Sequence, residues 1–262
     1  MINVGIIGFG NMGKAIAEQL AISKKYLVFH FDRKLHKNRH SIACSSIPIM
    51  LKKAEVVILA VKPQNFIEIK EDLIQSVAAR HTVVSIMGGV SLRAISAKLN
   101  CKNIIRSMPN LALRYQASLT GWFAHPECSK RSSRTAKEIF LLWGRDIKCR
   151  KENQLNDITA AAGSGPSYFL MIADLIYRYC RKRGFDEKKS LLISRQVLKG
   201  ADRCYSSMPI KPLEIIKKIT SKGGTTEAAF KCFKQQKVEN KIMSGIIKAG
   251  KRAKELEKIL NK

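Results

Sequence analysis

Residues 2–16 read INVGIIGFGNMGKAI, and this stretch decides the fold. A short apolar run ends at Gly8, the glycines Gly8, Gly10 and Gly13 follow in the spacing GxGxxG, and a helical pattern begins at once. In this context Gly8 permits a tight turn, Gly10 lets a pyrophosphate approach the backbone, and Gly13 lets the helix pack closely. The N-terminus of the helix also offers N–H groups to the anion. We expect dinucleotide contacts from the whole turn: Ile7, Gly8, Phe9, Gly10, Asn11, Met12 and Gly13.

The rest of the first half alternates short β-branched runs with amphipathic stretches. We interpret the runs as buried parallel strands at residues 2–7, 27–31, 56–61, 82–87, 104–108 and 119–124. Helical patterns lie between them at residues 11–21 and 91–99, and Ser91 can cap the second helix. Repetition of strand, crossover helix and strand predicts an α/β fold, with an N-terminal Rossmann domain built on a doubly wound parallel sheet.

After about residue 152 the strand signals stop and long stretches of helical period follow. They cover residues 153–162, 167–183, 188–206, 212–219, 226–236 and 239–260. This change of period predicts two domains: an NAD(P)-binding Rossmann domain at 1–150 and an all-helical domain at 151–262.

The end of the second strand bears on the choice of nicotinamide cofactor. Asp32 would suit the ribose hydroxyls of NAD, whereas Arg33 and Lys34 would suit the 2′-phosphate of NADP. Because two or more cations crowd this position, we favour NADPH and keep NADH as the alternative.

Two later strands also end at the sheet edge where a dinucleotide lies in such folds. Lys62 can approach the ribose or the phosphates, and the small residues Gly88 and Gly89 let a nicotinamide ring lie against the backbone. The alternatives are a solvated loop lysine and a plain turn. Further cofactor contacts are expected at Ala60, Val61, Lys62, Pro63, Gly88 and Gly89.

Five ordered motifs extend over almost the whole chain. They are GFGNMG at 8–13, AVKPQ at 60–64, RSMPN at 106–110, GSGPSY at 163–168 and SKGGTT at 221–226. In these motifs and their order the chain resembles the pyrroline-5-carboxylate reductases. The resemblance implies an oxidoreductase that reduces 1-pyrroline-5-carboxylate, a small cyclic imine acid, to L-proline in the last step of proline biosynthesis. It also implies that the helical domain mediates dimerisation, in a homodimer or a higher homo-oligomer.

The SKGGTT segment precedes a helical pattern and offers a nest of backbone N–H groups suited to a carboxylate. By resemblance, Gly223, Gly224, Thr225 and Thr226 hold the substrate carboxylate, and the catalytic Thr226 hydroxyl lies close to the ring nitrogen. Ser164 lines the substrate pocket as a supporting residue. An ordinary helix cap is the alternative for the threonines.

The sequence is also compatible with competing functions. The chain departs from the usual family pattern at Leu111, Ala112, Asn156, Ile210 and Lys222. A diverged, basic paralogue with weak or other imine or keto acid reductase activity is therefore one alternative, and a non-enzymatic binding role is another. A β-hydroxyacid dehydrogenase is less favoured, because no lysine follows Gly165 at the spacing that its proton donor needs.

Composition bears on the partners, the cellular compartment and the metal content of the protein. The net charge of +28 is diffuse, so nucleic acid is an unlikely partner, and no stretch has the length of a membrane span. Seven cysteines without a CxxC pair fit a reducing cytoplasm. The histidines form no HExxH motif, and we expect no metal.

Overall fold

The structure, a computed structural model, describes residues 1–34, 36–97, 99 and 101–260. The chain forms two compact units. Unit 1 contains residues 1–164 together with 249–262, and unit 2 contains residues 165–248. The division into domains at 1–150 and 151–262, which the change of period predicts, stays a prediction.

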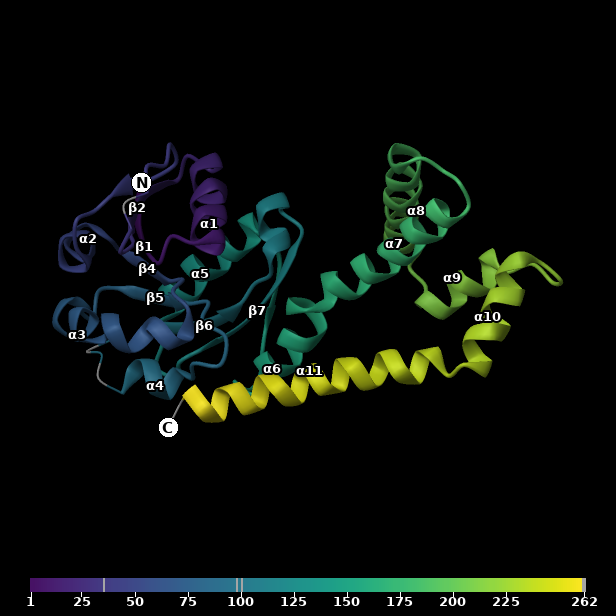
Figure 1. The fold of residues 1–262 in the computed structure, drawn as a ribbon. Coiled ribbons are helices and arrows are strands. Elements are labelled where there is room, and N and C mark those ends of the chain that lie inside the picture. Colours follow the sequence, from purple (N-terminus) through teal and green to yellow (C-terminus); the bar gives the residue numbers. More distant parts are fainter. Residues whose placement is uncertain (35, 98, 100, 261–262) are drawn as a thin grey trace. The chain divides into compact units, whose positions relative to one another are not determined.

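Unit 1 is built around an eight-stranded sheet with the strand order β3-β2-β1-β4-β5-β6-β7-β8 (Figure 1). The strands are β1 (Ile2–Ile7), β2 (Tyr26–Phe31), β3 (Ile42–Ala43), β4 (Val56–Leu59), β5 (Thr82–Ser85), β6 (Ile104–Met108), β7 (Ser118–Ala124) and β8 (Gly144–Lys148). The reversal of strand order beside β1 is that of a doubly wound Rossmann fold. The expected fold class is confirmed.

One expected feature of the sheet is wrong. The segment 119–124 was expected to be parallel to its neighbours, but β7 pairs antiparallel with β6, with Met108 opposite Gly121. The nine residues 109–117 that join the two strands are too few for a parallel crossover, which needs about a dozen or more. They form instead the short 3-10 helix η2 (Leu111–Tyr115).

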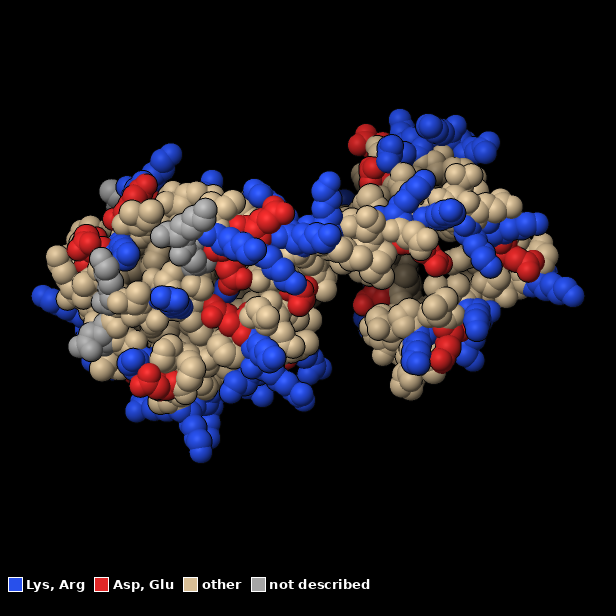
Figure 2. All heavy atoms as spheres, turned by 90° about the horizontal axis from the view of Figure 1, so that it is seen from below, with Lys and Arg blue, Asp and Glu red and all other residues tan. Residues whose placement is uncertain are grey.

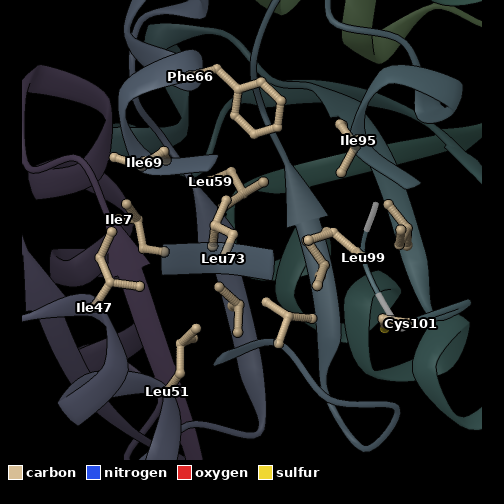
Figure 3. Packing of buried hydrophobic residues seen from close by; sticks show 14 of the residues in the cluster. Ile7, Ile47, Leu51, Leu59, Phe66, Ile69, Leu73, Ile95, Leu99 and Cys101 are labelled. Carbon is tan, nitrogen blue, oxygen red and sulfur yellow. The ribbon is translucent and has the colours of Figure 1, made fainter. Parts of the chain in front are cut away.

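Helices cover both faces of the sheet because side chains alternate along each buried strand. One face packs on α2 (Ile47–Lys53), α3 (Phe66–Ser76) and α4 (Leu92–Ser96), and Figure 3 shows part of this cluster. The other face packs on α1 (Asn11–Ile22) and α5 (Lys130–Leu142), where Phe140 and Trp143 are fully buried. In β1, Ile6 belongs to one cluster and Ile7 to the other.

The expected cap of the helix after β5 is confirmed, since Ser91 Oγ accepts a bond of 3.1 Å from the Ala94 N–H. The helix ends at Ser96, earlier than the expected residue 99. Residue 98 lies outside the described residues.

The last elements of unit 1 before residue 165 are α6 (Gln154–Ile158) and a π-helical turn, η3 (Thr159–Gly163). Unit 2 is helical, as the sequence predicts. It contains α7 (Gly165–Lys182), α8 (Glu187–Ser207), α9 (Pro212–Ile219), α10 (Thr225–Gln235) and the first part of α11 (Val238–Leu260).

On the face drawn in Figure 2, lysine and arginine are spread widely, with aspartate and glutamate between them.

Candidate active site

The register of the sheet brings three strand ends to one place. Ile7 lies opposite Phe31 of β2 and opposite Leu59 of β4, so Gly8, Asp32 and Ala60 follow at the same edge. The Gly8 N–H donates to Phe31 O at 2.9 Å, and the Ala60 N–H donates to Ile7 O at 2.8 Å. The glycine-rich turn is therefore fixed by backbone bonds to both neighbouring strands.

The three glycines differ in the space around them. Gly8 has a φ of +94°, and a Cβ there would lie 2.7 Å from the Val61 nitrogen. A Cβ on Gly13 would lie 2.2 Å from Gly8 O, because α1 packs directly on the turn. A Cβ on Gly10, in contrast, would meet no atom within 4 Å. The open space therefore lies at Gly10, where a ligand can reach the backbone.

The N-terminus of α1 faces this open space without a cap of its own. Gly10 is the N-cap residue and has no side chain to bind the first N–H groups, and the first turn carries no acidic residue. These N–H groups have no acceptor within the helix and, with the helix dipole, favour an anion. Asn11 is exposed and Met12 is half-buried. The arrangement fits the pyrophosphate of a dinucleotide.

Phe9 and Ile7 are fully buried, so their side chains belong to the core and only their backbones can meet a ligand. The Phe9 ring stacks on His30, with centroids 3.8 Å apart. Burial lowers the pKa of His30, which keeps this imidazole neutral at pH 7. The stack holds the glycine-rich turn against β2.

Asp32 is bound to the backbone of the turn. Its carboxylate accepts bonds from the N–H groups of Phe9 at 2.6 Å and Lys34 at 3.1 Å. Partial burial acts to raise the pKa of this carboxyl, but the two backbone bonds, together with the nearby His36 and His30, outweigh it and the pKa is lowered. Both carboxylate oxygens are thus in use.

The two cations after Asp32 differ in their surroundings. Arg33 forms an ion pair with Glu68 of α3, whereas Lys34 is exposed and has no ion-pair partner among the residues that the structure describes. A small pocket lies beside Arg33 and is lined by Ile7, Gly8, Phe31, Asp32, Arg33, Val61, Asn65 and Ile69. Sequence reasoning did not identify Glu68, because its position beside Arg33 depends on the packing of α3.

The segment after β4 borders the same edge. Ala60 and Val61 are half-buried against Gly8, and Lys62 is exposed. The strand ends at Leu59, before the expected residue 61, and Pro63 begins the short 3-10 helix η1 (Pro63–Asn65). Lys62 therefore stands as a cation next to the glycine-rich turn.

The turn after β5 meets two other motifs. Met108 Cε lies 4.0 Å from the Cβ position of Gly88 and 3.5 Å from that of Gly163. Asn110 Nδ2 donates to Ala162 O at 2.8 Å. The RSMPN motif thus joins the Gly88 turn to the start of GSGPSY. Gly88 is half-buried and Gly89 is buried.

The π-helical turn leads directly into Ser164. The Ser164 N–H donates to Thr159 O at 2.9 Å, a bond that spans five residues. Such turns occur often at functional sites. Ser164 is half-buried, and the turn brings it to the same part of unit 1 as Gly163 and Met108.

In unit 2, the SKGGTT segment forms the turn before α10. Gly223 has a φ of +73°, and Gly224 packs on Ser221, whose Oγ would lie 2.4 Å from an added Cβ. Gly224 is an N-cap without a side chain, so the first N–H groups of α10, including those of Thr225 and Thr226, have no acceptor within the helix. The Gly224 N–H itself donates to Ser221 O at 3.1 Å, so the open donors of this turn are those at the start of α10.

Glu227 is a residue of this turn that sequence reasoning missed. Its Oε2 accepts a bond of 2.5 Å from the Gly223 N–H. The signal was available, because an acidic residue at the third helical position often reaches back to the residues before the helix. The N–H groups of both glycines are thus bonded within the chain, that of Gly223 to Glu227 and that of Gly224 to Ser221 O.

Neither a cluster of metal-binding side chains nor a membrane-spanning helix is present in the described part of the chain. No group of three or more His, Cys, Asp or Glu side chains stands close enough there to hold a metal ion. No described helix is long and apolar enough to cross a membrane.

A Rossmann unit with an open glycine-rich turn, joined to a helical unit, defines a dinucleotide-dependent oxidoreductase. Residues 3–89 match the family model described as NADP oxidoreductase coenzyme F420-dependent, and residues 152–256 match pyrroline-5-carboxylate reductase dimerisation. The chain belongs to the pyrroline-5-carboxylate reductase family.

Relatives and solved structures agree over nearly the full length. The pyrroline-5-carboxylate reductase of Haemophilus influenzae is 29% identical and is covered over 97% of both chains. Pyrroline-5-carboxylate reductase 2 of Bacillus subtilis is 28% identical, over 98% of this chain and 96% of the relative. The structure of the Coxiella burnetii reductase has a TM-score of 0.87 at 28% identity, over 97% of this chain and 98% of that chain.

Proposed function

We propose that this protein reduces 1-pyrroline-5-carboxylate to L-proline with NADPH. The observation that carries the proposal is the similarity to pyrroline-5-carboxylate reductases over 97% of the chain, with the open glycine-rich turn that a dinucleotide requires. When bound, the cofactor supplies a hydride to the imine carbon. The C=N electron pair passes to the ring nitrogen, and the iminium form of the substrate already carries the proton that becomes the amine N–H.

The dinucleotide would lie along the edge of the sheet in unit 1. In this proposal the α1 N-terminus binds the pyrophosphate at Gly10 and Lys62 supports the phosphates. Gly88 offers the backbone surface for the nicotinamide, and the buried Gly89 fixes the turn. Ser164 lines the site beside Gly163.

The preference for NADPH rests on the groups at the end of β2. Each oxygen of Asp32 already accepts one backbone N–H, which leaves fewer lone pairs for the ribose hydroxyls of NADH. Lys34 is exposed, and Arg33 can exchange Glu68 for a 2′-phosphate. NADH remains the weaker alternative.

The substrate carboxylate would bind the nest before α10. The N–H groups of Thr225 and Thr226 supply donors at the positive end of the helix. The Thr226 hydroxyl then supports the ring nitrogen. Gly223 and Gly224 give the turn its shape, and Gly223 becomes a donor to the substrate only when Glu227 releases it.

We also propose that the protein is at least a homodimer formed by the region 151–262. Helices of unit 2 expose large apolar side chains that would be costly to leave in water, among them Phe169, Leu170, Ile172 and Leu175 of α7. The match of residues 152–256 to a dimerisation model supports the same region. Light scattering of the purified protein tests this proposal, and a monomer at micromolar concentration would contradict it.

The reaction is tested by the initial rate of NADPH oxidation, and then of NADH oxidation, with freshly prepared 1-pyrroline-5-carboxylate. Saturable turnover with NADPH and weaker turnover with NADH is the expected result. Dinucleotide binding without turnover would instead favour another imine or keto acid as substrate. Absence of dinucleotide binding would favour a non-enzymatic role.

The role of Thr226 has its own test. Thr226→Ala should reduce turnover about ten- to a hundredfold, since a positioned hydrogen bond to a charged group contributes about 1.5–3 kcal/mol. Thr220→Ala is a matched control, because Thr220 Oγ1 bonds Ile216 O at the end of α9. A wild-type rate in Thr226→Ala would exclude the proposed role.

A further inference from the structure

A buried polar cluster joins separate segments of unit 1. Arg106 of β6 is 3% exposed; its Nη1 lies 2.8 Å from Glu152 Oε1 and also bonds Glu257 Oε1. Glu152 Oε1 accepts a bond of 2.7 Å from the Leu92 N–H, and Glu257 Oε2 accepts one of 2.6 Å from Asn156 Nδ2. One guanidinium thus bridges two carboxylates, each of which has a second donor.

Glu257 lies in the last turn of α11, and this turn touches Gly89. A Cβ on Gly89 would lie 3.0 Å from Leu260 Cδ1 and 3.4 Å from the Glu257 nitrogen. The φ of Gly89 is +81°, which favours glycine. The turn after β5 is therefore held directly against the C-terminal end of α11.

We propose that Arg106 and Glu257 are positioning residues of the reductase, a proposal that rests on the proposed function. Their ion pair fixes the last turn of α11 against Gly89, and this fixes the neighbouring Gly88, on which the nicotinamide is proposed to lie. Neither residue needs to touch the cofactor or the substrate.

The rate of hydride transfer and the affinity for the cofactor should depend on different residues. The phosphates and the ribose are proposed to bind at residues 8–13, 33–34 and 62, whereas the cluster acts only on the turn at 88–89. Hydride transfer is sensitive to displacements of about 1 Å, which can reduce a rate by about a hundredfold. Loss of the bridge should therefore lower kcat much more than it weakens cofactor binding.

The test compares Glu257→Gln with Glu255→Gln in the full-length protein. Glu255 lies on the same turn but pairs with Arg252 in the solvent. The measurements are kcat with 1-pyrroline-5-carboxylate, the Kd of NADPH, the melting temperature and the emission maximum of bound NADPH. Glu257→Gln should lower kcat about ten- to a hundredfold with little change in Kd, and should shift the emission towards that of free NADPH. Glu255→Gln should match the wild type.

Leu260→Ala provides a second variant that leaves every charge in place. It removes the contact with Gly89 and should lower kcat in the same selective way. Wild-type kcat and emission in both variants would overturn the proposal. A parallel fall of kcat, NADPH affinity and melting temperature would also overturn it, because such a fall indicates general destabilisation. If the wild type binds NADPH without reducing the imine acid, the proposed function fails, and the emission of bound NADPH still decides the positioning role.

Discussion

Replacement of Gly10 by alanine separates cofactor binding from folding. A Cβ at Gly10 meets no atom of the protein within 4 Å, and its φ of −73° suits alanine. The folded protein should therefore accept the methyl group. Alanine is a poorer N-cap than glycine, so we expect a loss of about 0.5–1 kcal/mol in the free energy of unfolding.

Cofactor binding should suffer far more, because the methyl group fills the space proposed for the pyrophosphate. Loss of one hydrogen bond to a charged group costs about 1.5–3 kcal/mol, which corresponds to a Kd for NADPH about ten- to a hundredfold weaker. Calorimetric titration gives the Kd, and urea unfolding gives the stability.

Gly13→Ala is the informative comparison. Its Cβ would lie 2.2 Å from Gly8 O, so α1 or the turn must move and the protein should lose at least about 1–3 kcal/mol of stability. If Gly10→Ala bound NADPH as tightly as the wild type, the pyrophosphate would not lie at Gly10. A large loss of stability in Gly10→Ala would show that the space beside it is needed by the fold.

Three further substitutions test the surroundings of the site. Glu68→Gln should tighten NADPH binding about two- to fivefold and leave NADH unchanged, because it releases Arg33; equal Kd values would contradict the pairing. Asp32→Asn should destabilise the protein at pH 7. Because the pKa of Asp32 is lowered in the folded state, its contribution to stability is complete above about pH 4 and is lost as the pH falls through the folded pKa. Urea midpoints of the variant and the wild type that differ equally at pH 3 and pH 7 would refute this prediction. Asn156→Asp should cost about 1–3 kcal/mol at pH 7 by placing a carboxylate against Glu257, with the loss smaller near pH 4 in the same urea assay.

The sequence predicted the glycine-rich turn and the helical half because both signals are local. The three glycines stand within six residues and adjoin the strand and helix that they connect. The helix periods after residue 152 need no knowledge of distant contacts. Strand direction is less accessible, because the apolar run of β7 does not reveal its direction, whereas the short connection from β6 does.

Long-range partners could not be predicted from sequence. Asp32 and Arg33 looked like free ligands for the ribose and its phosphate, but one binds the Phe9 N–H and the other pairs with Glu68. Asn156 looked like a departure from the family pattern, and the structure gives it a partner 101 positions away in Glu257. An amide can donate to that carboxylate, which an ionised acid cannot do.

The return of α11 to unit 1 has a consequence for synthesis on the ribosome. Unit 1 contains two segments that are far apart in the sequence, residues 1–164 and residues 249–262. Domains generally fold in the order in which they are translated. Here the sheet emerges early, yet Arg106 must wait for Glu257, which is made 151 positions later. A chain that stops before this residue leaves a buried cation short of one carboxylate, which lowers the stability of the sheet that carries it.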